Sequence, residues 1–211
     1  NCTGYRKRPR CDIGYYPSLF GVDIRISHTD SQPVDLLSKD LYKILEFSIY
    51  AEGKNSIEDV IIQLAKSKNR TVSTAESCTG GLIGHRLTEV SGSSDVYKGG
   101  FVVYSNESKI NLLDVDKSIL KKYGAVSAET AQAMAKNVTK IFASDYGISV
   151  TGIAGPAGGT DQKPVGLVYI GFAKNDDVKV KKFHFGTDRK KNKLRTSQAA
   201  LNWLRLSLLN D

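Results

Sequence analysis

The 211-residue sequence has only three cysteines and three histidines, and it lacks any long apolar run. Three cysteines at no metal-like spacing argue against both a disulfide framework and a zinc site. No run approaches the roughly 18 apolar residues of a membrane span, so we expect no membrane partner. The first residues are basic and lack the apolar core of a secretion signal. These absences favour a cytoplasmic globular protein.

The formal net charge of +8 raises the question of a nucleic-acid partner. The excess positive charge is concentrated in residues 6–10 and 179–195. Residues 6–10 contain no aromatic residue, and we do not interpret Phe183 and Phe185 in the second stretch as a base-stacking surface. We therefore expect no nucleic-acid partner, and interpret the charge as a solvated basic face or as a field that attracts a phosphate-bearing small molecule.

The first part of the chain predicts a small α+β domain. Strand-like segments over 12–16 and 21–27 precede a helical pattern over 33–47, and 47–51 resembles another short strand. We expect a loose basic arm followed by this β-β-α-β unit, together spanning residues 1–54.

The second part, residues 55–211, predicts a larger α/β domain. Ser56 and Asp59 form a capping-box signal for its first helix. Strands and helices then alternate, ending in a hairpin and a last helix with leucines in helical spacing. This order predicts a three-layer α/β/α domain with a mixed sheet. The expected elements are strands near 71, 101 and 148, a hairpin over 165–173 and 178–185, and helices from 78, over 107–123, over 127–142 and around 201–208.

The segment Thr74–Gly81 (TAESCTGG) is the most informative motif. It places Ser77 at the expected start of a helix, where free backbone N–H groups stabilise phosphate or a developing oxyanion. Gly80 and Gly81 would let a ligand approach the backbone closely. The same pattern also suits an ordinary helix N-cap. We interpret Cys78 as a small apolar filler rather than as the nucleophile.

Two further motifs follow expected strands. Tyr104–Lys109 (YSNESK) comes after an apolar run, and the glycine-rich segment Thr151–Thr160 comes after another. Functional residues collect at the carboxyl ends of strands in open α/β sheets, and a glycine-rich loop can form an anion-binding nest. The loop is not a Walker motif, because no Gly-Lys-Ser/Thr closes it.

These motifs, together with Gly92–Ser94 (GSS) and Lys163–Gly166 (KPVG), resemble the carboxyl-terminal domain of the CinA (competence-damage-inducible) family. The resemblance runs from about Ile57 to Leu209, and the preceding residues resemble the small middle domain of longer CinA proteins. It implies a nicotinamide mononucleotide amidohydrolase. The large amino-terminal domain of those proteins, which resembles molybdopterin-binding proteins, is missing, so we expect a fragment or a short form.

Amide hydrolysis requires a nucleophile, a proton relay and oxyanion donors. His85 is the only histidine near a motif, and it lies within the expected helix, which disfavours a Ser-His-Asp triad. Scattered histidines also disfavour a metal site, so we expect neither a metal nor a cofactor. Lys109 is then the natural base for Ser77, provided that burial lowers its pKa. The CinA resemblance implies the same pair, with Tyr104 as a hydrogen-bonding or relay partner.

The resemblance also implies a set of substrate-binding residues. Arg189 and Arg195 are candidates for the phosphate, but the family's Gly-Asp-Arg pattern is altered here and Lys193 stands where a further arginine is usual. Which cation meets the phosphate stays open. The expected set is Thr79, Gly80, Gly81, Ser94, Asn106, Thr151, Gly152, Gly155, Arg189 and Arg195.

Two functions follow from this sequence. The first is hydrolysis of nicotinamide mononucleotide to nicotinate mononucleotide and ammonia, which recycles pyridine nucleotide. The second is a non-catalytic nucleotide-binding module linked to competence or DNA-uptake proteins. Retention of Ser77, Tyr104 and Lys109 favours the enzyme, because a binding site needs no activated nucleophile. We also expect a homo-oligomer.

Overall fold

The structure is a computed structural model that describes residues 10–211. The residues over 1–9, where most of the basic arm was expected, lie outside the described part. The chain divides after Glu52 into two units. Within residues 10–211, no helix combines the length and the apolar character that crossing a membrane requires.

The described residues of the first unit form an antiparallel hairpin and one α-helix. β1 (Asp12–Pro17) pairs with β2 (Val22–Ser27), and α1 (Ser31–Leu45) follows. The expected strand over 47–51 is wrong. Glu46 takes a positive φ of 44° and ends α1, and the chain closes into the 3₁₀ turn η1 (Glu46–Ser48). From residue 10 on, the unit is therefore β-β-α, and residues 47–51 do not form the final strand predicted from the sequence.

The second unit contains a five-stranded sheet in the order β4-β3-β5-β6-β7. β3, β4 and β5 are parallel, whereas β6 and β7 run antiparallel to their neighbours. The predicted mixed sheet is confirmed. Its parallel strands end together at one edge, which we call the carboxyl end of the sheet. The strands are β3 (Val72–Glu76), β4 (Tyr97–Val102), β5 (Tyr146–Gly152), β6 (Leu167–Lys174) and β7 (Asp177–His184).

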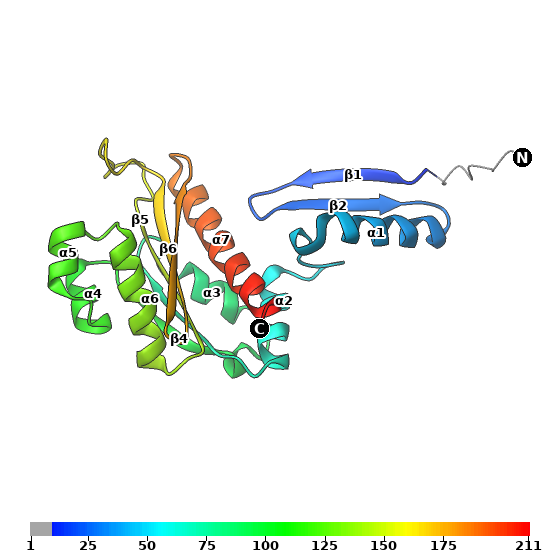
Figure 1. Cartoon of the computed structure of the whole chain (residues 1–211). Coiled ribbons are helices and arrows are strands. Elements are labelled where there is room, and N and C mark those ends of the chain that lie inside the picture. Colours follow the sequence, from blue (N-terminus) through cyan, green and yellow to red (C-terminus); the bar gives the residue numbers. More distant parts are fainter. Residues whose placement is uncertain (1–9) are drawn as a thin grey trace, which may run out of the picture. The chain divides into compact units, whose positions relative to one another are not determined.

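Helices cover both faces of this sheet, as predicted (Figure 1). Apolar side chains of α6 pack with Ala75 of β3 in a buried core. On the opposite face, the predicted leucines of the last helix are fully buried. One face carries α4 (Asn106–Leu113), α5 (Lys117–Tyr123) and α6 (Ala128–Phe142), and the other carries α2 (Ile57–Ser67), α3 (Leu82–Thr88) and α7 (Arg189–Leu209).

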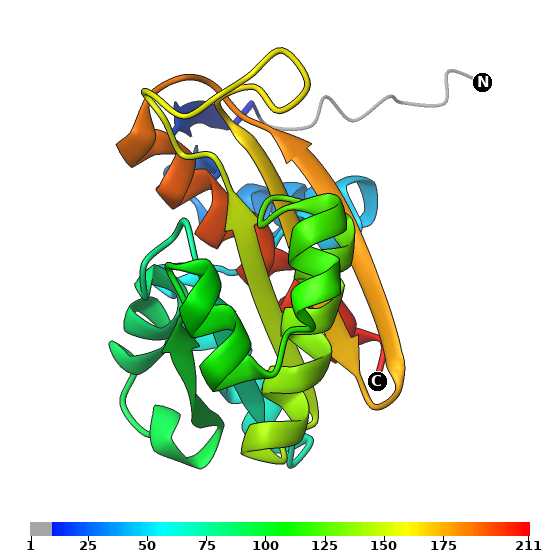
Figure 2. The same ribbon diagram turned by 90° about the vertical axis from the view of Figure 1, so that its left-hand side faces the viewer.

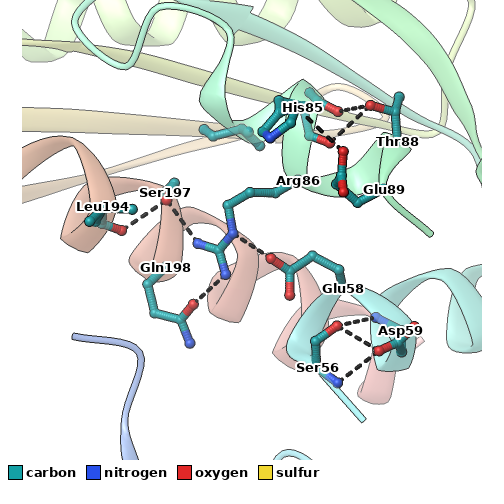
Figure 3. Close-up of polar contacts among 12 residues, drawn as sticks. Ser56, Glu58, Asp59, His85, Arg86, Thr88, Glu89, Leu194, Ser197 and Gln198 are labelled. Atoms are coloured by element: carbon teal, nitrogen blue, oxygen red, sulfur yellow. Dashed lines mark hydrogen bonds and ion pairs between the residues drawn. The ribbon is translucent and has the colours of Figure 1, made fainter. Parts of the chain in front are cut away.

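Polar contacts join the three helices of the second face. The predicted capping box at the start of α2 is confirmed, with Ser56 Oγ accepting from the N–H of Asp59 at 3.2 Å. Arg86 of α3 forms an ion pair with Glu58 of α2 and donates to Ser197 Oγ (2.8 Å) and Gln198 Oε1 (2.7 Å) of α7 (Figure 3). This cluster fixes α3 against α7, and both helices begin near the carboxyl end of the sheet.

Candidate active site at the carboxyl end of the sheet

Three strand ends and the start of α7 surround one cavity. It has a volume of about 280 Å³. The glycine-rich loop after β5 and the start of α7 lie at this same end of the unit in both views (Figure 2). The cavity is lined by Ser77, Cys78, Tyr104, Lys109, Ala125, Val126, Thr151, Gly152, Ile153, Ala154, Gly155, Ala157, Gly158 and Arg189.

Ser77 directly follows β3, whose five residues are all buried. Its N–H donates to the Val150 carbonyl at 3.0 Å, and its own carbonyl accepts from the N–H of Gly80 at 3.1 Å. The residue is 8% exposed and contributes to the cavity wall. These bonds hold the serine in a turn at the end of the central parallel strand.

The prediction that Ser77 stands at a helix start is wrong. α3 begins only at Leu82, after Gly80 and Gly81 with φ values of +65° and +88°. The chain must pass through two left-handed positions between the serine turn and the helix, and glycine adopts that conformation without a steric penalty. The glycines therefore shape the turn, and neither of them lines the cavity.

Glu76, to which the sequence analysis gave no role, occupies the start of α3. Its carboxylate accepts from the N–H groups of Ile83 (3.1 Å) and Gly84 (2.9 Å). The donors that were expected to face a ligand are thus bound by the protein itself. The available signal was a single acidic residue at the end of an otherwise uncharged, fully buried strand.

Lys109 is placed by the first turn of α4. Ser105 and Ser108 form a capping box there, and the lysine side chain turns back toward the end of β4. Nζ lies 2.8 Å from the Val103 carbonyl, 3.4 Å from the Ser105 carbonyl and 3.1 Å from Ser77 Oγ. The structure therefore brings Ser77 and Lys109 together.

The environment of Lys109 disfavours its charged form. The residue is 1% exposed, and it takes part in none of the ion pairs among residues 10–211. Burial lowers the pKa of its ammonium group. A neutral amine at this position can accept the proton of the serine hydroxyl.

Cys78 is adjacent to the nucleophile candidate but is unsuited to the same role. Burial raises the pKa of its thiol to about 12, and the nearby Glu76 carboxylate adds to that effect. The thiolate is the reactive form of cysteine. Cys78 therefore stays protonated and inert, in line with its interpretation as a filler.

Tyr104 and Arg189 form the exposed rim of the cavity. Arg189 Nη2 donates to Tyr104 Oη at 2.9 Å, and Nη1 donates to the Gly155 carbonyl at 3.1 Å. Lys193 lies one turn further along α7, with Nζ 3.5 Å from the position of a Cβ on Gly80. Two cations of α7 thus lie near the site, and Arg189 is the one that lines the cavity.

The glycine-rich loop lines the cavity with backbone. The Thr151 hydroxyl donates to the Ala125 carbonyl at 2.7 Å, so it joins β5 to the connection between α5 and α6. A Cβ on Gly152 would lie 2.7 Å from the Leu167 carbonyl, and one on Gly155 would lie 2.8 Å from that of Thr187. The backbone packs so closely at these two positions that a side chain would clash, which explains why both residues are glycine.

Several predicted substrate residues lie away from the cavity. Asn106 and Arg195 are exposed and do not line it. Ser94 lies in the short turn η2 (Ser93–Asp95), at the opposite end of the sheet, next to the start of β4. Thr79 is fully buried outside the lining, and its hydroxyl has no hydrogen-bond partner among the described residues.

Ala125 and Val126 are lining residues that the sequence analysis missed. They belong to the connection that precedes the N-cap of α6. They carry no polar group and follow no motif, so only the packing of α6 against the sheet brings them to the cavity. Their side chains add apolar surface to the cavity that Ser77 and Lys109 also line.

Comparison with known proteins agrees with this architecture. The family model described as the CinA C-terminal domain matches residues 54–208. A protein of Caldicellulosiruptor bescii named as competence-damage inducible is 45% identical over 206 residues, covering 94% of this chain and 50% of the relative. A similarly named protein of Thermoanaerobacter sp. is 48% identical over 85% of this chain and 43% of its own length. The chain thus spans about half the length of these curated relatives.

Solved structures show the same fold. The competence/damage inducible protein CihA from Agrobacterium tumefaciens has a TM-score of 0.70 and 40% sequence identity, covering 72% of this chain and 93% of its own. A CinA superfamily protein from Escherichia coli has a TM-score of 0.67 and 27% identity, covering 77% and 98%. The family match spans most of the second unit, including every residue that lines the cavity. The chain belongs to the CinA family.

Proposed function

We propose that this protein hydrolyses the carboxamide of nicotinamide mononucleotide, giving nicotinate mononucleotide and ammonia. One observation carries the proposal: a serine hydroxyl lies 3.1 Å from the amine of a buried lysine that has no carboxylate partner among the described residues. Burying an unpaired cation is unfavourable, and such perturbed groups cluster at functional sites. A pure binding site has no need of this pair.

The pair supports acyl transfer in two steps. Ser77 Oγ attacks the carboxamide carbon while its proton passes to the neutral Lys109 Nζ. The C–N bond then breaks, and the lysine ammonium gives that proton to the leaving nitrogen, which departs as ammonia. A water molecule next attacks the acyl-serine ester and transfers its proton to Lys109. The Oγ–C bond then breaks, the Lys109 ammonium returns that proton to Ser77 Oγ, and the carboxylic acid is released.

The cavity suits a ligand with a flat apolar end and an anionic end. Ala125, Val126 and Ile153 provide apolar surface near Ser77. Arg189 at the rim presents a planar fork of donors, the group best shaped for a phosphate. The choice of nicotinamide mononucleotide among amides of this shape rests on the CinA resemblance.

A second candidate is a nucleotide-binding module without turnover. The observation that favours it is the competence-damage name borne by the relatives. This alternative predicts binding of nicotinamide mononucleotide but no release of ammonia.

Ammonia release from nicotinamide mononucleotide by the purified protein tests the proposal, with the nicotinate product identified by chromatography. Nicotinamide riboside, which lacks the phosphate, is the matched control substrate. We expect turnover of the mononucleotide and a much lower kcat/KM for the riboside, because Arg189 would lose its phosphate partner. Tight binding of the mononucleotide without ammonia release would favour the binding module instead.

A further inference from the structure

Glu76 is a buried carboxylate beside the nucleophile, and its contacts are unusual for a strand residue. It is 1% exposed. Oε2 accepts from the N–H of Ile83 and Oε1 accepts from the N–H of Gly84, the second and third residues of α3. These are the donors that an N-cap side chain normally satisfies. The N-cap of α3 is Gly81, which has no side chain, so Glu76 caps the helix from five residues upstream.

This contact closes the loop that carries Ser77. The loop runs from Ser77 to Gly81, and its only internal backbone bond is the 3.1 Å contact from Gly80 to Ser77. Two of its residues are glycines, which have the largest conformational freedom to lose. With Glu76 in the strand and its carboxylate on α3, both ends of the loop are tied by one residue.

The backbone of Glu76 also connects to the lysine. Its carbonyl accepts from the N–H of Val103 at 2.8 Å, and the Val103 carbonyl in turn accepts from Lys109 Nζ at 2.8 Å. A displacement of Glu76 therefore reaches both members of the Ser77–Lys109 pair. Hydrogen bonds depend on direction as well as distance, so these two bonds couple the position of Glu76 to that of Lys109.

We propose that Glu76 is a positioning residue that holds Ser77 Oγ within proton-transfer distance of Lys109 Nζ. This inference rests on the proposed function, and it adds a residue that acts through Ser77 rather than on the substrate. The Glu76 carboxylate also fills the positive end of α3.

The test compares Glu76→Gln with Asp145→Asn. Both variants replace a carboxylate by an amide, but at opposite ends of β3. Glu76 is the last residue of β3, whereas Asp145 Oδ2 accepts from the N–H and hydroxyl of Thr71, just before its first residue. The amide nitrogen of Gln cannot accept, so one of the two bonds to α3 is lost. Two measurements are made on each protein: hydrogen exchange of the backbone over 77–84, and the kcat and KM for nicotinamide mononucleotide.

For Glu76→Gln we expect exchange over 77–84 to accelerate at least tenfold and kcat to fall about 10- to 100-fold, with KM changed less than threefold, because misplacement of a reacting group by about 1 Å costs that much in rate. Glu76→Asp, one methylene shorter, should fall between Gln and wild type in both measurements. Asp145→Asn should lower the unfolding temperature but leave both measurements at wild-type values.

Unchanged exchange over 77–84 in Glu76→Gln overturns the inference, whatever the activity. Faster exchange with wild-type kcat overturns it as well, because the loop would then not position the nucleophile. If the wild-type protein itself releases no ammonia, the proposed function fails. The exchange result then decides by itself whether Glu76 holds the loop.

Discussion

The two ends of the five-stranded sheet differ in whether their cationic side chains form ion pairs. At the carboxyl end, Lys109 is buried without a carboxylate partner among the described residues. At the other end, Arg70 and Lys174 both form ion pairs with Asp211, and Arg70 also lies 3.6 Å from Asp145. Among the described residues, one end of the sheet thus has a buried lysine without a carboxylate partner, and the other end has a cluster of ion pairs.

The difference separates a functional end from a structural end. Desolvation at the carboxyl end lowers the pKa of Lys109 and favours the neutral amine. At the other end, the bonds from Lys174 and Arg70 hold the pKa of Asp211 well below its usual range and favour the charged carboxylate. Burial without a counterion makes the neutral amine of a lysine available as a base, whereas an ion pair keeps both of its groups charged.

Ser77→Ala should have the largest effect on activity. We expect kcat to fall by about 10⁴-fold or more, because a residue acting as nucleophile in a coupled pair cannot be replaced by its partners. The unfolding temperature should change by only a few degrees, since the hydroxyl contributes little to the packing of the core. Ser118→Ala, at an exposed serine of α5, is the matched control and should retain full activity. Ammonia release by Ser77→Ala at the wild-type rate would remove the serine from the mechanism.

Two replacements of Lys109 should each reduce kcat about 10³-fold, because a positioned base contributes about that much to the rate. The two variants should differ in stability. Lys109→Met is one atom shorter, keeps the unbranched shape of the side chain and removes the buried amine, so its unfolding temperature should equal or exceed that of wild type. Lys109→Arg retains a charge that cannot be neutralised, so it should be both inactive and less stable. Calorimetry and ammonia release measure the two effects. Substantial activity in Lys109→Arg would show that the lysine acts only through its charge.

The pH dependence should identify the base at the carboxyl end. Only the neutral amine accepts a proton, so kcat/KM should fall about tenfold per pH unit below the pKa of Lys109. Because burial lowers that pKa from the ordinary lysine value, the fall begins at a lower pH than an exposed lysine would give. A limb at the usual carboxylate pKa near 4 would contradict a lysine base. The profile in Asp145→Asn, which lies at the other end of the sheet, should match wild type.

The sequence predicted the second unit well because its signals are local. Helical spacing of leucines, the Ser56 capping box and the alternation of strands and helices each depend on neighbouring residues. The failed predictions, a strand over 47–51 and a helix from Cys78, both placed a regular element where the backbone enters left-handed conformations at Glu46, Gly80 and Gly81.

The site was only partly predictable, because sequence signals are local and part of the site depends on how the chain folds back on itself. Motifs at strand ends identified Ser77 and Lys109, because parallel strands bring their carboxyl ends together. The apolar surface of Ala125 and Val126 depends on packing between distant segments, and the bonds from Glu76 to α3, seven and eight residues on, depend on the turn between β3 and α3. Sequence spacing also could not distinguish Arg189 from Arg195, because the orientation of α7 at the cavity decides which cation lines it.

The smallest expected effect is that of Asp211→Asn, at the compensated end of the sheet. The Asp211 side chain is 8% exposed and accepts from Arg70 Nε at 2.6 Å as well as from Lys174. Losing the charge should reduce the free energy of unfolding by about 1 kcal/mol near pH 7, because Arg70 and Lys174 are more than a third exposed and water screens both ion pairs. Ammonia release should stay at the wild-type rate, because the cavity lies at the other end of the sheet.

The pH sign of this effect follows from the lowered pKa of Asp211. A carboxyl whose folded pKa lies below its unfolded value stabilises the protein above the unfolded pKa of about 4, and this contribution disappears as the pH falls toward the folded pKa. Denaturant unfolding at several pH values should therefore show the difference between wild type and Asp211→Asn shrinking below pH 4. A constant difference down to pH 2 would mean that packing rather than charge holds this end together. A loss of ammonia release in Asp211→Asn would show that the two ends of the sheet are not independent.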